Sequence, residues 1–116
     1  MSLHALRSFD AFVLSLPATT LVEQWGGHVG KVGGKVFVLC GVEGGQLVFK
    51  VSEMSFEGLT ALPGVEQAPY FAKRHWVSVA RGALPDADLK AYIRRSHETV
   101  AAGLTRKLRT ELGLTT

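Results

Sequence analysis

Residues 33–41 read GGKVFVLCG and contain the most apolar run of this 116-residue chain. Two consecutive glycines suit the tight primed turns of β-hairpins, in which φ is positive. The run Val36–Leu39 that follows predicts a central strand, covered on both faces or on one face plus a partner. We therefore expect this stretch to form the middle of a β-sheet, joined to a short strand at residues 28–32.

The next segment, residues 46–51, alternates between two kinds of side chain. Leu47, Phe49 and Val51 share one face because successive side chains of a strand point to opposite sides. This face is expected to meet the core, which sends Lys50 to the opposite face.

Three segments have the apolar spacing of amphipathic helices. These segments are residues 2–16, 52–62 and 84–112. Ser2 and Ser52 are the expected N-caps of the first two. Gly103 is expected to kink or end the third, after which residues 104–116 form either a second short helix or a frayed tail.

The elements follow in the order α-β-β-β-α-β-β-α, with the last two strands at residues 65–70 and 75–81. The sequence does not decide whether residues 18–27 form a strand or a loop, because their extended start is followed by two glycines. Hairpin-length connections predict an antiparallel sheet with the helices on one face, which is an α+β two-layer sandwich. Residues 1–116 contain no linker or repeat, so we expect a single domain whose uncovered sheet face is open to solvent or to a partner.

Composition favours a small cytoplasmic protein. The chain start lacks the pattern of a signal peptide, and no apolar run approaches the roughly 20 residues of a membrane span, so no membrane partner is expected. Cys40 is the only cysteine and lies in an apolar run, which predicts a buried thiol. The net charge of +3 is too small to indicate polyanion binding by itself.

No catalytic or metal-binding pattern is present. None of the glycine pairs opens a helix with Lys-Ser/Thr after it, so there is no phosphate loop. Ser78 has His75 nearby but no carboxylate to orient the histidine. The four histidines are far apart in sequence, and one cysteine cannot build a structural zinc site. We therefore expect no enzyme activity, no metal and no cofactor.

A basic and aromatic stretch, Lys73-Arg74-His75-Trp76, is the main candidate binding site. Residues 69–84 around it contain no acidic residue. Lys73 and Arg74 either contact phosphates or belong to a solvated turn. His75 either donates to a phosphate or bonds a backbone carbonyl. Trp76 either stacks on a base or lines the core.

Lysines of the predicted sheet extend this candidate site. Lys31, Lys35 and Lys50 can share one sheet face, where they either bind a polyanion or discourage edge-to-edge aggregation. The full set proposed to bind nucleic acid is Lys31, Lys35, Lys50, Lys73, Arg74, His75, Trp76 and Arg81. The hypothesis requires these side chains to meet on one exposed surface.

The order of elements and three short motifs resemble the MmcQ/YjbR family of small bacterial proteins. The motifs are KVGGKVF at residues 31–37, LVFKV at residues 47–51, and KRHW at residues 73–76 followed by VSV. The resemblance runs from about Leu6 to Leu104. The chain departs from the family at His97, where Tyr is commoner, and at Val77, where Asn is common.

This resemblance implies a fold similar to type III secretion chaperones and frataxin-like sheets. It also implies a DNA-binding role of the "double wing" type. The resulting hypothesis is a non-enzymatic DNA-binding module. The alternative is a protein-interaction or chaperone-like module that uses the open sheet face or a homodimer.

Overall fold

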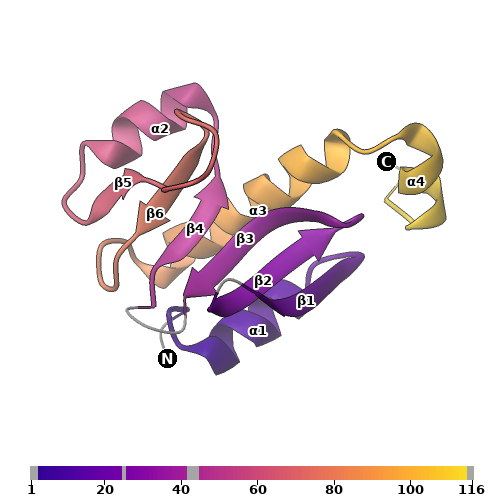
Figure 1. Ribbon diagram of the computed structural model, residues 1–116, viewed down its shortest axis with the longest axis horizontal. Helices are drawn as coiled ribbons and strands as arrows, with labels where there is room; N and C mark the ends of the chain where they lie inside the picture. The colour runs from indigo at the N-terminus through magenta and orange to yellow at the C-terminus, as the bar shows by residue number, and fades with distance from the viewer. Residues whose placement is uncertain (1–2, 25, 42–44, 115–116) are drawn as a thin grey trace.

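The computed structural model describes residues 3–24, 26–41 and 45–114. They form helices and strands in the order shown in Figure 1. The helices are α1 (Leu6–Leu14), α2 (Glu53–Thr60), α3 (Asp86–Ala102) and α4 (Arg106–Glu111). The strands are β1 (Thr19–Gln24), β2 (Gly27–Val32), β3 (Lys35–Gly41), β4 (Leu47–Lys50), β5 (Val65–Gln67) and β6 (Trp76–Val79).

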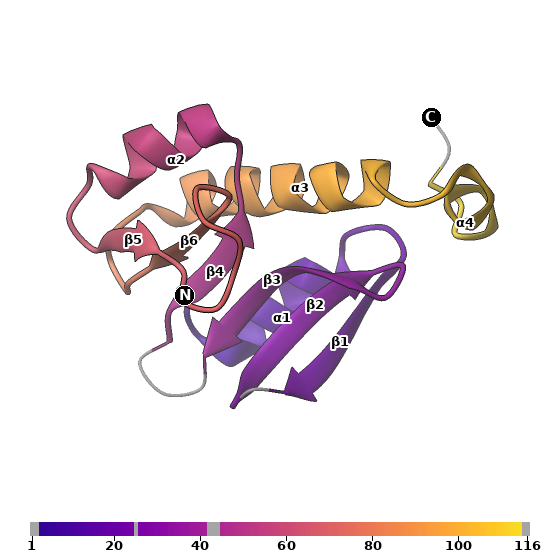
Figure 2. The same cartoon turned by 45° about the horizontal axis from the view of Figure 1, so that its top comes forward.

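The strands form one sheet in the order β1-β2-β3-β4-β6-β5, and every neighbouring pair is antiparallel. Helices α1 and α3 lie against the same face of this sheet (Figure 2). Leu59 of α2 joins the core on that side too. The predicted α+β two-layer architecture is therefore confirmed.

Residues 19–24, which the sequence left open, form the edge strand β1. Val22 pairs with Val29 of β2 and Thr19 with Val32, so the two strands make a hairpin. Gly26 has φ of 71° between them, a conformation that favours glycine. Four strands thus precede α2, one more than in the predicted order α-β-β-β-α-β-β-α.

Strand β3 contains a bulge at Phe37, because its register with β2 shifts between Gly30 and Lys31. A bulge inserts one extra residue and changes the phase of the side chains beyond it. Consequently Phe37 and Val38 both join the core under the helices, while Leu39 packs on the opposite face.

The helix ends largely follow the predicted signals. Ser52 caps α2 by accepting a hydrogen bond from the Ser55 N–H. Helix α3 ends at Gly103, and α4 follows as a separate short helix capped by Thr105. The cap expected at Ser2 lies outside the described residues, and α1 begins at Leu6, after Ala5.

Two buried polar side chains of α3 join the helix to the sheet. The Ser96 hydroxyl donates to the Phe37 carbonyl (2.6 Å) and accepts from the Lys50 N–H (3.0 Å). His97 Nε2 donates to the Pro17 carbonyl (2.8 Å), and its ring meets that of Phe37 edge-on at 5.0 Å. His97 therefore has a structural role in the fold.

Within the described residues, no helix combines the length and apolar character that a bilayer crossing requires.

Candidate nucleic-acid interface

The sheet face opposite α1 and α3, called here the open face, is centred on Val36, Leu39, Val48 and Trp76. On β6, Trp76 lies on this face and Val77 in the main core. Lys50 of β4 pairs with Trp76 across the two strands. Lys50 and Trp76 therefore lie on the same face of the sheet.

The indole of Trp76 is covered. Only 9% of the residue is exposed, and the Phe71 ring lies over it with the ring centroids 4.5 Å apart. Val48 and Ala68 complete this small apolar cluster. Of the two interpretations of Trp76, the structure supports the packing role, because little ring surface is left on which a base could stack.

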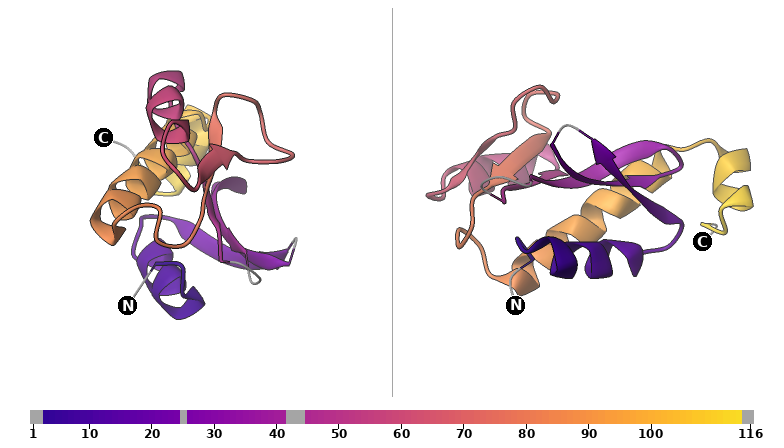
Figure 3. Two further views of the ribbon diagram at one scale, coloured as in Figure 1. Left: turned by 90° about the vertical axis from the view of Figure 1, so that its left-hand side faces the viewer. Right: turned by 60° about the horizontal axis from the view of Figure 1, so that its bottom comes forward.

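The cover is a loop formed by residues 68–75 between β5 and β6. It stands out from the sheet on the side away from α3 (Figure 3, left). The Gln67 side chain braces it, since its amide donates to the Ala68 carbonyl (2.7 Å) and its oxygen accepts from the Arg74 N–H (2.9 Å). Tyr70 and Arg74 have φ of 69° and 68°. Non-glycine residues rarely adopt this conformation, and such strain concentrates at functional sites.

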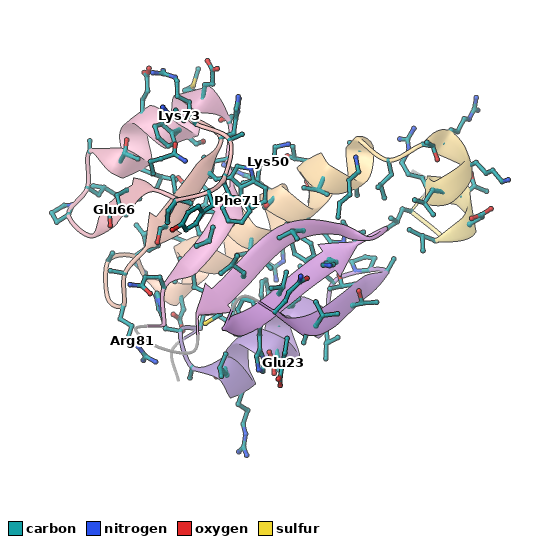
Figure 4. The ribbon with its side chains drawn as sticks, viewed as in Figure 1. Glu23, Lys50, Glu66, Phe71, Lys73 and Arg81 are labelled. Carbon is teal, nitrogen blue, oxygen red and sulfur yellow. The ribbon has the colours of Figure 1, made fainter. Side chains whose placement is uncertain are left out.

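The braced loop exposes two side chains suited to a nucleic acid. Tyr70 is fully exposed, with a relative accessibility of 104%, and Lys73 is also exposed. Figure 4 shows Lys73, Phe71 and Lys50 on the same side of the molecule. Sequence reasoning missed Tyr70, because nothing in Tyr70-Phe71 indicates which ring is covered and which is free.

Two members of the predicted basic stretch face acidic residues of α2. Arg74 pairs with Glu57 at 2.6 Å, with the two side chains 54% and 69% exposed. His75 Nε2 lies 3.8 Å from a Glu53 carboxylate oxygen. Ion pairs this exposed contribute only about 0–1 kcal/mol to stability, so breaking the Arg74–Glu57 pair costs little.

Arg81 does not join this group. It lies beyond the end of β6 farthest from Trp76, where its guanidinium donates to the His4 carbonyl (3.3 Å) and lies close to Gly45. Figure 4 shows it well separated from Lys73. The predicted set therefore does not meet in one place.

The three lysines of the sheet do not all lie together either: Lys31 and Lys50 lie on the open face, whereas Lys35 lies at the turn between β2 and β3. Lys31 lies on the open face, since its neighbours Gly30 and Val32 face α1 and the core. Strand β3 alone separates it from β4, which carries Lys50. Lys35 is exposed at the start of β3, next to the Gly33-Gly34 turn. The structure thus brings together Lys31 and Lys50, with Lys73 of the loop on the same side.

The described residues contain no group of three or more His, Cys, Asp or Glu side chains able to hold a metal ion. Cys40 is fully buried. Burial raises the pKa of its thiol from 9.0 to about 11, an effect that nearby Arg81 opposes and Asp10 supports. The thiol is therefore protonated at neutral pH, which disfavours a nucleophilic role.

Comparison with known proteins agrees with this architecture. The family model YjbR matches residues 14–99. The Deinococcus radiodurans protein DR2400, which has a DUF419 domain, superimposes with a TM-score of 0.84 at 26% identity, over 94% of this chain and 88% of that one. A Pseudomonas syringae protein shares the fold with a TM-score of 0.65 at 19% identity, over 79% of this chain and 95% of that one. None of the curated proteins compared matches the chain.

Proposed function

This chain belongs to the YjbR family, and from that premise we propose that it is a small, non-enzymatic DNA-binding module. The proposed surface consists of Tyr70 and Lys73 of the loop together with Lys31 and Lys50 of the open face. The observation that supports it is the braced loop, which carries both a fully exposed aromatic ring, Tyr70, and an exposed lysine, Lys73.

Each group has a distinct role in this proposal. The three lysines contact backbone phosphates, which gives affinity without sequence information. Tyr70 replaces Trp76 as the ring that packs on a sugar or an unstacked base. Arg74 stays paired with Glu57 in this proposal and contacts a phosphate only in a variant that lacks this carboxylate.

The interface is only weakly positive. Glu66 of β5 lies on the open face as well, because it pairs with Ser78. We therefore expect modest affinity without strong sequence preference.

Fluorescence anisotropy with a labelled DNA duplex at a series of salt concentrations tests the proposal. Three phosphate contacts at about 0.9 released counterions each give a slope of roughly −2.7 in log K against log salt. Saturable binding at low salt with a slope near this value supports the proposal. Failure to bind either duplex or single-stranded DNA at low salt would remove it.

Variants locate the surface. Lys73→Ala should make the slope shallower by about 0.9. Tyr70→Ala should weaken binding about five-fold or more, most clearly for single-stranded DNA, since stacking contributes roughly 1–3 kcal/mol per base. Lys107→Ala is the matched control, because Lys107 is exposed on α4 and its loss changes the net charge equally. Equal effects of the Lys73 and Lys107 variants would contradict the assigned surface.

A second candidate is a protein-interaction module or homodimer that uses the open face. Val36, Leu39 and Phe71 are only half-buried there and form an apolar centre. The adjacent edge strand β1 leaves Val22 38% exposed. Light scattering that shows a dimer at micromolar concentration, together with no DNA binding, would favour this function over the first.

A further inference from the structure

A pocket of about 470 Å³ lies where the end of α1, the second half of α3 and helix α4 meet. Figure 1 shows α4 at the end of the molecule opposite α2 and β5, so the pocket is well separated from the loop of residues 68–75. Its volume falls within the range of roughly 300–1,000 Å³ that is usual for small-molecule sites.

Two guanidinium groups line this pocket. Arg109 of α4 has a buried Nε–H that lacks a hydrogen-bond partner among the described residues. Arg94 of α3 stacks on the Phe12 ring, with its Cζ 5.2 Å from the ring centroid, which leaves the edge of the guanidinium free to donate. Neither arginine takes part in an ion pair found within the described residues.

The other lining groups are mostly apolar. Leu16, Pro17, Ala101 and Leu114 form much of the wall. His97 also lines the pocket, but its Nε2 already bonds the Pro17 carbonyl. Glu98 is the single carboxylate among the lining residues, so the two arginines leave a net charge of about +1 with histidine neutral.

We propose that this pocket binds a small organic anion with a compact apolar body. The anionic head, a carboxylate or a phosphate monoester, accepts hydrogen bonds from Arg109 and Arg94, because a guanidinium fork matches either group. The apolar body packs against the wall formed by Leu16 and Leu114. Glu98 accepts a hydrogen bond from any donor that the ligand carries.

A ¹⁵N–¹H chemical-shift titration of the full chain tests this site. The probes are phenylacetate and phenyl phosphate, and neutral phenylacetamide is the matched control. We expect saturable shifts in residues 94–114 with one or both anions at millimolar concentration, and much smaller shifts with the amide. Comparison of the two anions decides between a carboxylate and a phosphate head.

Arg109→Gln should weaken binding of the better anion about ten-fold or more, since a charge-assisted hydrogen bond is lost. Lys107→Gln, an equal charge change on the same helix, should leave binding unchanged. Ala102→Phe should block binding by filling the pocket while it retains both arginines, which covers the case in which Arg109→Gln perturbs α4.

Absence of saturable shifts with both anions, an equal response to the amide, or unchanged binding by both Arg109→Gln and Ala102→Phe would overturn the proposal. These outcomes are independent of DNA binding, because none of the four residues assigned to the DNA surface lines the pocket.

Discussion

Replacing Ser96 by alanine removes the hydroxyl that joins α3 to the sheet beside the β3 bulge. Ser96 has no exposed surface, and its oxygen makes both of the bonds that hold the Phe37 carbonyl and the Lys50 N–H to the helix. The substitution leaves these two backbone groups in the interior without this partner. It also loosens the strand end that carries Lys50, one of the residues assigned to the DNA surface.

The expected cost follows from these two bonds. An unsatisfied buried donor or acceptor costs about 1–3 kcal/mol. Alanine is the better helix former by about 0.5 kcal/mol, which offsets a small part of this. Ser96→Ala should therefore lower the free energy of unfolding by about 1.5–5.5 kcal/mol, a large share of the roughly 5–15 kcal/mol of a typical domain.

Urea unfolding followed by circular dichroism measures this change, and hydrogen exchange at the Lys50 amide reports its location. Ser55→Ala on α2 is the control, because it deletes the same atom from a half-buried serine whose hydroxyl makes no hydrogen bond to any described residue. It should change stability by less than about 0.5 kcal/mol. A loss of less than about 1 kcal/mol in Ser96→Ala, with unchanged exchange at Lys50, would refute the assigned role of the hydroxyl.

Three further predictions follow from particular contacts. Gly30→Ala should lower the free energy of unfolding by about 1–3 kcal/mol in urea, because an added Cβ would lie 2.8 Å from a methyl group of α1. By contrast, a Cβ added at Gly58 of α2 would meet no atom within 4 Å, so Gly58→Ala should raise the free energy of unfolding by about 0.5–1 kcal/mol. Glu57→Gln frees Arg74 and should strengthen DNA binding and steepen its salt slope, by about 0.9 if Arg74 gains a phosphate; weaker binding would contradict the exchange. The pKa of Cys40 is higher in the folded chain, so the protonated thiol contributes fully to stability below about pH 9, and this contribution falls as the pH rises to about 11. The free energy of unfolding of Cys40→Ala should therefore fall less than that of the parent between about pH 9 and about pH 11. An equal fall in both proteins would count against a buried thiol.

Local sequence signals predict much of the fold because they depend on neighbouring residues. The alternation in residues 46–51 correctly assigns Phe49 to the core and Lys50 to the open face. Ser52 correctly marks the start of α2. The bulge at Phe37 is not predictable in this way, since a continuous apolar run has no polar residue to reveal a change of phase.

The candidate site is harder to predict because its properties depend on distant contacts. The ion pair that occupies Arg74 involves Glu57, 17 residues earlier. The cover on Trp76 depends on how the loop folds back, which places Phe71 inside and Tyr70 outside. Residue type indicates which groups can contact DNA, but only the tertiary structure shows which of them are accessible.

A ¹⁵N–¹H chemical-shift titration with a short DNA duplex at low salt tests the proposed function most directly. We expect saturable shifts in residues 69–75 and at Lys31 and Lys50, which disappear as salt is added. Shifts confined to α3 and α4, or no saturable shift at any residue, would contradict it.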